Sequence, residues 1–260
     1  MKISFSSMRN GLFITGAIVM GGLLLSACNK LGDDNNGNGD TPASGLMAFN
    51  LAPDKPALQV ALSGSSLTNS PLAYGSYTGN YLAVYTGMKN VEAYDNAGSP
   101  FASTPVNFEA KKYYSAFVVG AGGNYQNVVV NDNFDSLSVA NGEAYVRYIN
   151  AIPDSGAAPL VTISANGSNV STGNAAFTTV SSFTAVTPGD VNIAVSNGGT
   201  INANRTINLE QKKAYTVLLV GRPSGAGSTD SIQIKYITNG ALSDSSAGRA
   251  SSSARPATAN

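Results

Sequence analysis

The single cysteine of this 260-residue chain, Cys28, is the residue whose type and position point most directly to chemistry. It follows an apolar run over residues 11–25, and that run begins just after Lys2 and Arg9. A basic start, a short apolar stretch and small residues before a cleavage point are typical of a bacterial secretion signal. We therefore predict that residues 1–27 are a signal peptide.

The segment Leu25-Ser26-Ala27-Cys28 resembles the lipobox of bacterial lipoproteins, in which the cysteine thiol receives a diacylglyceryl group and the chain is cut just before it. The small residues before the cysteine let the backbone enter the peptidase cleft. A single transmembrane anchor is the alternative, but about 15 apolar residues are short for a span that needs roughly 20. The expected partner of Cys28 is therefore membrane lipid.

The composition excludes most catalytic and metal chemistry. The chain has no His, so it holds no histidine base and no His-containing zinc site, and one cysteine cannot form an internal disulfide. Asp54 and Asp154 each follow a proline, where a catalytic carboxylate is conceivable but an Asx-turn is the usual role. We predict a non-enzyme with no catalytic residue and no cofactor, and a hydrolase is the remote alternative.

The segment Asn131-Asp132-Asn133-Phe134-Asp135 places oxygen ligands at alternate positions, as a calcium site would. It lacks the glycine and the distal glutamate of an EF-hand loop, so we predict no metal site. Nucleic acid is not expected as a partner, because 15 basic residues balance 15 acidic ones and nothing resembles a phosphate-neutralising surface.

An internal repeat sets the organisation of the chain. Asn107–Gly120 and Asn208–Gly221 share Glu, Lys-Lys, Tyr and an apolar run, and they start 101 positions apart. Asn50–Asp54 and Asn150–Asp154 share the pattern Asn-x-x-Pro-Asp and start 100 positions apart. Whole modules therefore repeat in tandem, and each is expected to fold alone.

The repeat also predicts the boundaries. They are the lipidated Cys28 with a flexible tether (28–44), module one (45–141), module two (142–242) and a disordered tail (243–260). The tether is too polar to bury apolar surface, and its random-coil reach is roughly 20–24 Å. Asp33 and Asp34 in it resemble the acidic export signal of surface lipoproteins in the Bacteroidetes. We expect an outer membrane lipoprotein, on the cell surface or on the periplasmic face.

Each module is predicted to hold seven short strands separated by Gly, Pro and Asn. Only 12% of the residues are charged and 28 are glycine, which favours strands and tight turns over helices. Asn166-Gly167 and Asn239-Gly240 supply the positive φ angles of such turns. The expected fold is all-β, with two tandem immunoglobulin-like or transthyretin-like antiparallel β-sandwich modules.

Comparison of the two copies separates core positions from surface positions. Val191, Ile193 and Val195 alternate with polar or small residues, which predicts that they face inward. Arg147 stands where the first copy has Met47, so position 147 is predicted to face outward or to lie at the boundary between modules.

Three tyrosines distinguish module one from module two. Tyr85, Tyr94 and Tyr113 align with the small residues Thr187, Ser196 and Ala214 of the second copy. The common core therefore does not require them, and they are candidates for stacking on a sugar or packing on a protein. The alternative is that they fill the seam between the modules.

Module two resembles the domain of unknown function 4397 family, a bacterial extracytoplasmic β-domain often found on lipoproteins. The resemblance is carried by Ala144–Asp154, Val186–Val191 and Leu209–Val217, and module one is a more divergent copy. It implies a location and a fold but no activity. We expect a lipid-anchored envelope protein that binds a glycan or a protein, or else a structural spacer or adhesin-like surface domain with no small-molecule ligand.

Overall fold

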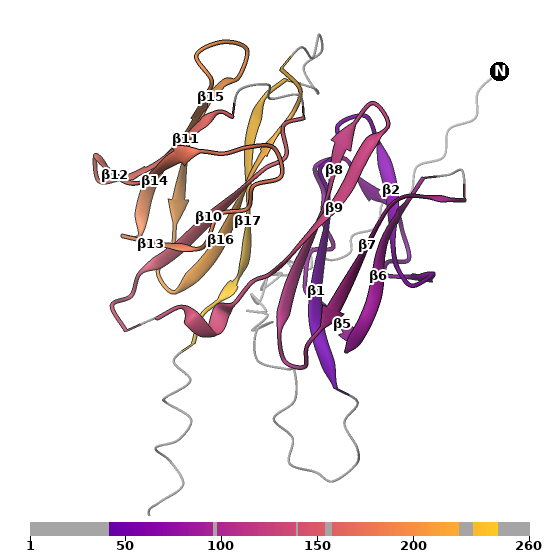
Figure 1. Ribbon diagram of the computed structural model, residues 1–260. Coiled ribbons are helices and arrows are strands. Elements are labelled where there is room, and N and C mark those ends of the chain that lie inside the picture. The colour runs from indigo at the N-terminus through magenta and orange to yellow at the C-terminus, as the bar shows by residue number, and fades with distance from the viewer. Residues whose placement is uncertain (1–41, 96–97, 139, 154–157, 224–230, 244–260) are drawn as a thin grey trace, which may run out of the picture.

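The computed structural model describes residues 42–95, 98–138, 140–153, 158–223 and 231–243 (Figure 1). Cys28, the tether up to residue 41, Asp154 and the tail from residue 244 lie outside the described residues, so the predictions that fall on them stay predictions. Within the described part, no helix is long and apolar enough to cross a membrane.

The described chain is built of strands, with one short 3-10 turn, η1 (Phe134–Ser136), between the modules. The strands of module one are β1 (Ala43–Asn50), β2 (Ala57–Leu62), β3 (Ser65–Ser66), β4 (Leu72–Ala73), β5 (Leu82–Tyr85), β6 (Gly87–Tyr94), β7 (Pro100–Phe108), β8 (Tyr113–Ala121) and β9 (Asn124–Asn131). Those of module two are β10 (Ala144–Asn150), β11 (Leu160–Ala165), β12 (Ser168–Asn174), β13 (Thr184–Val186), β14 (Gly189–Ser196), β15 (Asn202–Leu209), β16 (Lys213–Val220) and β17 (Gln233–Ala241).

Each module is a sandwich of two sheets, which confirms the all-β expectation. In module one the sheets have the orders β5-β1-β8-β9 and β3-β2-β6-β7, with β4 beside β2. In module two the orders are β13-β10-β16-β17 and β12-β11-β14-β15. The expectation of purely antiparallel sheets is wrong, because β1 pairs with β8 in parallel and β10 pairs with β16 in parallel. After its opening strand the chain crosses to the second sheet, returns once as the antiparallel edge strand β5 or β13, crosses again, and then comes back in the original direction as β8 or β16.

Each module buries its own apolar core between its two sheets. In module two Val191, Ile193 and Val195 are fully buried in this core, which confirms the predicted inward set. In module one the equivalent strand contributes Val91 and Ala93. Burial of these side chains at alternate positions fixes the register of each strand, since a slip by one residue would expose the whole set.

The first asparagine of each repeated signature holds the end of the opening strand. Asn50 Nδ2 donates to the carbonyls of Lys55 and Leu72, and its Oδ1 accepts from the amide of Ala52. Asn150 makes the matching bonds to the carbonyl of Ala175 and the amide of Ile152. The recurrence of this residue therefore reflects buried backbone groups that need a polar partner.

Two predicted turns have opposite outcomes. Asn166 and Gly167 have φ angles of 51° and 76°, as the tight turn between β11 and β12 requires. Asn239-Gly240 is not a turn, because both residues lie inside β17, where a register shift opposite Ala214 and Tyr215 accommodates an extra residue. The bulge directs the Asn239 side chain into the seam described below.

Candidate functional site

The two modules contact each other through equivalent faces of their equivalent sheets, β5-β1-β8-β9 and β13-β10-β16-β17. An apolar cluster separate from both cores joins β1 and β8 of module one to β10, β16 and β17 of module two. Its buried members are Met47, Phe49, Leu51, Phe117, Val119, Ile149, Ala151, Leu218, Val220 and Ile237. We call this contact the seam, and Figure 1 shows the two sandwiches that it joins lying side by side. Because equivalent residues such as Phe49 and Ile149 meet there, the seam resembles the interface of a symmetric dimer.

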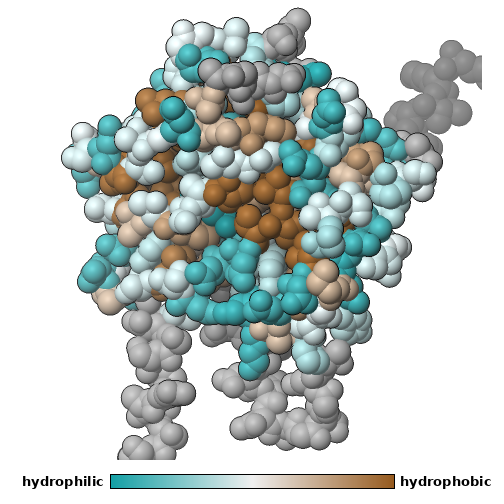
Figure 2. Space-filling view, in the orientation of Figure 1, coloured by the Kyte–Doolittle hydropathy of each residue, from teal (hydrophilic) through white to brown (hydrophobic). Residues whose placement is uncertain are grey.

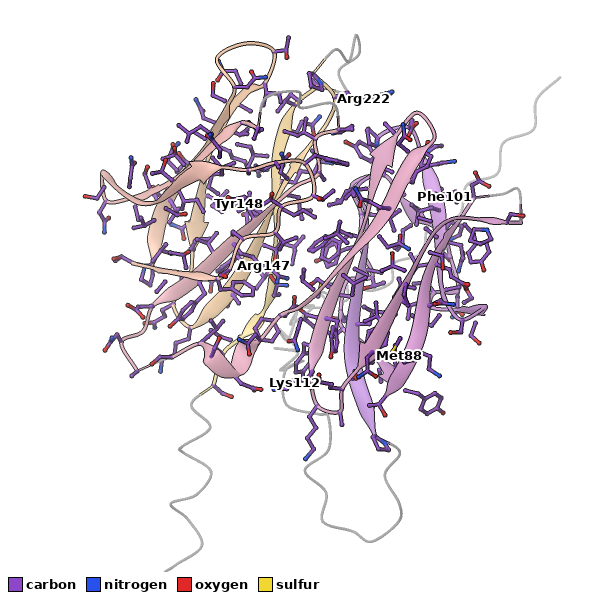
Figure 3. The ribbon with its side chains drawn as sticks, in the orientation of Figure 1. Met88, Phe101, Lys112, Arg147, Tyr148 and Arg222 are labelled. Carbon is purple, nitrogen blue, oxygen red and sulfur yellow. The ribbon has the colours of Figure 1, made fainter. Side chains whose placement is uncertain are left out.

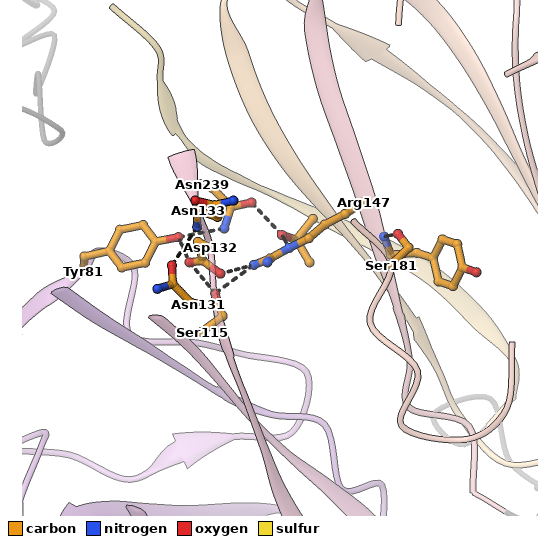
Figure 4. Close-up of polar contacts among 10 residues, drawn as sticks. Tyr81, Ser115, Asn131, Asp132, Asn133, Arg147, Ser181 and Asn239 are labelled. Atoms are coloured by element: carbon orange, nitrogen blue, oxygen red, sulfur yellow. Dashed lines mark hydrogen bonds and ion pairs between the residues drawn. The ribbon is translucent and has the colours of Figure 1, made fainter. Parts of the chain in front are cut away.

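A buried ion pair lies within the seam (Figure 4). Arg147 of β10 donates from its guanidinium to Asp132 Oδ1 at 2.6 Å and to Ser115 Oγ at 3.0 Å. The Arg147 and Asp132 side chains are 3% and 0% exposed. Arg147 also lies over the ring of Phe183, 4.5 Å from its centroid. Position 147 therefore lies at the module boundary, the second of the two places that the sequence allowed.

The same network extends into module two. Arg147 Nε donates to Thr216 Oγ1 at 3.0 Å, and Thr216 in turn donates to Asn239 Oδ1 at 2.6 Å. Asn239 Nδ2 donates to the Tyr81 hydroxyl at 3.0 Å, and that hydroxyl donates to Asp132. The hydrogen bonds thus run from module one into module two and back to module one. They hold the two modules in one relative position, because a shift of either module would break several bonds of the network.

Burial dominates the electrostatics of this network. It raises the pKa of the Asp132 carboxyl above its ordinary value, against the lowering effects of Arg147 and of the Tyr81 hydroxyl. Burial, together with the Asp132 charge, also raises the pKa of Tyr81 well above its ordinary value. The Tyr81 hydroxyl therefore keeps its proton and remains a hydrogen-bond donor.

A cleft of about 330 Å³ opens beside the ion pair. It is lined from module one and the segment after β9 by Val130, Asn131, Asp132, Asn133, Ser136 and Leu137, and from module two by Arg147, Val180, Ser181, Ser182 and Phe183. Figure 2 shows apolar surface near the middle of the face of the molecule that it draws. Clefts between domains are common ligand sites. We call this feature the seam cleft.

The acidic and amide groups after β9 do not converge on a point where a cation could bind. Asp132 accepts from Arg147, Asp135 pairs with Lys112 at 2.6 Å, and Asn131 Oδ1 accepts from the backbone amide of Asn133 at 2.8 Å. Within the described residues no group of three His, Cys, Asp or Glu side chains could hold a metal ion. The alternation of oxygen ligands in the sequence thus serves separate structural bonds.

The three predicted tyrosines lie in three different surroundings. Tyr85 ends β5 beside the start of β1, and it is 69% exposed. Tyr94 ends β6 in the other sheet and donates to Glu92 at 3.0 Å. Tyr113 opens β8 and packs edge-on to Tyr81, with ring centroids 5.0 Å apart. The structure therefore does not gather them into one patch.

A second cluster of charged and aromatic side chains lies at the end of module one opposite to the start of β1. Figure 3 shows this end near Phe101 and Arg222, and the other end near Met88 and Lys112. Lys55 pairs with Asp95 at 2.8 Å and lies over the Phe101 ring.

Asp54 accepts from the Gly122 amide and the Tyr125 hydroxyl, both at 2.7 Å. The Asx-turn expected at Asp54 is therefore wrong, because its carboxylate ties the β1–β2 connection to the β8–β9 turn.

Burial acts to raise the pKa of Asp54, but the bonds from Gly122 and Tyr125 outweigh it, and the pKa lies below its ordinary value. A carboxylate held in this way is a structural hydrogen-bond acceptor and is poorly suited to take up a proton in catalysis.

The sequence did not predict the Arg147–Asp132 pair. The only signal was that Arg147 replaces Met47 of the first copy, a buried position of the seam. Nothing in the sequence connects that change to Asp132, because the two residues belong to different modules and meet only when the seam forms.

The fold defines a tandem two-module β-sandwich protein. The chain belongs to the family described as "Domain of unknown function (DUF4397)", whose model matches residues 44–158 and again residues 144–251. The chain is also similar to the crystal structure of a provisionally named cell adhesion protein from Bacteroides eggerthii, at 14% identity and a TM-score of 0.22, over 78% of this chain and 93% of that one. A likeness at that TM-score carries no argument about function. The comparison with curated proteins gave no match.

Proposed function

We propose that the protein is a lipid-anchored protein of the cell envelope that binds a glycan or a protein ligand without catalysis, and that the seam cleft is its binding site. The observation that carries the proposal is that both modules line one cleft, beside the buried Arg147–Asp132 pair. A ligand there contacts side chains that a shared network already holds in place, which lowers the entropic cost of binding.

The state of the polar groups favours binding over catalysis. Asp54 and Asp132 each accept several hydrogen bonds, and Arg147 is neutralised by its carboxylate partner. General acid–base catalysis needs a group that can exchange a proton near neutral pH next to the substrate. A hydrolase stays the remote alternative.

The proposed anchor is Cys28, which ends the segment Leu25-Ser26-Ala27-Cys28. The two or three acyl chains of a bacterial lipoprotein give stable attachment, where a single chain gives only reversible binding. Cys28→Ala should release the protein from membrane fractions or leave an uncleaved precursor. Wild-type protein that is fully soluble with its first 27 residues intact would refute the anchor.

The binding site can be tested by filling the cleft. Ser182 lines it, is exposed, and its hydroxyl makes no hydrogen bond to another described residue, so Ser182→Trp should occupy the cleft without disturbing the core. Ala176→Trp, at an exposed position in the segment before β13 that does not line the cleft, is the matched control. In a screen of envelope glycans and envelope proteins, wild type and Ala176→Trp should retain the same ligand and Ser182→Trp should lose it. Equal retention by all three would show that the ligand binds elsewhere.

A structural spacer or adhesin-like surface domain with no small-molecule ligand is the second candidate. The seam favours it, because a large apolar contact with a buried ion pair makes two modules behave as one rigid unit. This reading predicts that no envelope component distinguishes wild type from Ser182→Trp.

A further inference from the structure

We propose that the seam cleft accepts an uncharged carbohydrate of one or two sugar rings. The proposal rests on the binding function above and names the class of its ligand. It is carried by the charge balance of the cleft, by the polar groups at its rim and by its apolar wall.

The cleft offers no unbalanced charge. Arg147 and Asp132 are the two charged residues among the described residues that line it, and they neutralise each other at 2.6 Å. Two further acceptors, Ser115 Oγ and Thr216 Oγ1, hold the guanidinium from the sides. An anionic ligand would have to compete with the Asp132 carboxylate for Arg147, and a cationic ligand would have to compete with Arg147 for Asp132. A neutral ligand competes with neither charge.

The rim offers neutral donors and acceptors. Asn131, Asn133 and Ser182 are exposed there. The Asn133 side-chain amide and the Ser182 hydroxyl make no hydrogen bond to another residue that the structure describes, and Asn131 uses only its oxygen, for the Asn133 amide. Amide and hydroxyl groups can each donate to and accept from the hydroxyls of a sugar.

Asn133 is presented to the cleft by an unusual backbone conformation. Its φ angle is 45° and its ψ angle is 44°, in the left-handed region that Asn and Gly tolerate best. It precedes η1 and does not cap it through its side chain. The backbone thus turns at a residue whose amide is left for another partner.

The apolar wall supplies the second half of sugar recognition. Phe183 is half-buried, and Leu137, Val130 and Val180 beside it are also half-buried. The C–H groups on one face of a sugar ring pack against such surfaces while its hydroxyls reach the polar rim. A volume of about 330 Å³ lies near the lower end of the roughly 300–1,000 Å³ typical of small-molecule sites, which suits about one or two rings.

The test is isothermal titration of the purified full chain with maltose, cellobiose and N,N′-diacetylchitobiose as neutral probes and digalacturonate as a charged one. At least one neutral disaccharide should bind, and digalacturonate should bind more weakly. Asn133→Gly keeps the left-handed backbone but removes the amide, and it should weaken binding by about tenfold, the effect of one or two lost hydrogen bonds. Asn133→Asp, which also tolerates this backbone, adds a charge and should weaken binding at least as much.

Asn166→Gly is the matched control, because Asn166 has a similar φ angle of 51° in a turn that does not line the cleft. It should bind like wild type. Tighter binding of digalacturonate, or wild-type affinity in both Asn133 variants with unchanged thermal stability, would overturn the proposal. If no disaccharide binds but an envelope component separates wild type from Ser182→Trp, the carbohydrate class is wrong and the binding function stands. If Ser182→Trp also makes no difference, both proposals fail.

Discussion

Ser115 and Thr216 occupy equivalent positions of the two repeats and accept hydrogen bonds from the same Arg147 guanidinium, both at 3.0 Å. Their neighbours are equivalent as well. Ser115 donates to Asp132 at 2.9 Å, and Thr216 donates to Asn239 at 2.6 Å. The seam is therefore an almost symmetric contact in which the charged members, Arg147 and Asp132, break the symmetry. Because the positions are equivalent, the residue that one module has at a given position can be used as the substitution to test in the other module.

The first prediction concerns the cost of breaking the ion pair. Arg147→Met installs the residue that module one has at the equivalent position and leaves the Asp132 carboxylate buried without its counter-charge. We expect a loss of about 3–5 kcal/mol in the free energy of unfolding. Adding Asp132→Asn, the residue type of Asn239, should recover most of that loss, because neutral side chains then fill both positions. Denaturant titration measures both variants, and a double variant no more stable than the single one would contradict the prediction.

The second prediction is a pH dependence. Burial raises the pKa of Asp132 in the folded protein above its unfolded value, so the folded state binds the proton more readily. The contribution of Asp132 to stability must then increase as pH falls through the folded pKa towards the ordinary value near 3.8. Wild type should therefore gain stability relative to Asp132→Asn between neutral pH and about pH 4. If this difference shrinks as pH falls, Arg147 outweighs burial and the pKa is depressed instead.

The third prediction concerns the separated modules. Module two has its own core, so the fragment 142–242 is expected to fold alone, as the repeat predicts. It will expose Ile149, Leu218 and Val220, which the seam buries in the full chain. In the fragment Arg147 has lost Asp132, so Arg147→Met is included to remove a charge that would be buried without its partner. Because the seam joins equivalent faces, this fragment should self-associate through that face in sedimentation experiments at micromolar concentration. Leu218→Lys should make it monomeric, whereas Val170→Lys, at an exposed position on β12, should not. If the Arg147→Met fragment is monomeric, this interpretation of the seam is contradicted.

The fourth prediction separates the tyrosines by their surroundings. Tyr85→Ser should change the free energy of unfolding by less than about 0.5 kcal/mol, because the side chain is 69% exposed. Tyr113→Ser should cost about 2 kcal/mol, since its ring packs against Tyr81 and Phe134 at centroid distances of 5.0 and 5.6 Å. Thermal unfolding of the two variants measures the contrast. Equal effects would mean that the aromatic cluster at the seam contributes nothing to stability.

Much of the fold could be predicted because the physical signals are local or repeated. The alternation at Val191, Ile193 and Val195 identifies a strand with one buried face, and Asn166-Gly167 identifies a tight turn, since both depend on backbone geometry within a few residues. The repeat revealed two equivalent modules without any knowledge of their contacts. Asn239-Gly240 was misread for the same reason, because the turn signal is local and the bulge in β17 depends on its partner strand.

The sequence by itself determined the all-β class, the two modules and the absence of a histidine base or a disulfide, because composition and periodicity are properties of the chain alone. The prediction of seven strands per module missed β3, β4 and β12. Only the tertiary structure decided that β1 and β8 run parallel, that Tyr113 faces the seam, and that Arg147 meets Asp132 beside a cleft. Each of these facts depends on which strands pair and which faces of the sheets pack against each other. Arg147 and Asp132 become a buried pair only because the packing of the two modules excludes water from both side chains. The residues around each of them therefore contain no pattern that identifies the other as its partner.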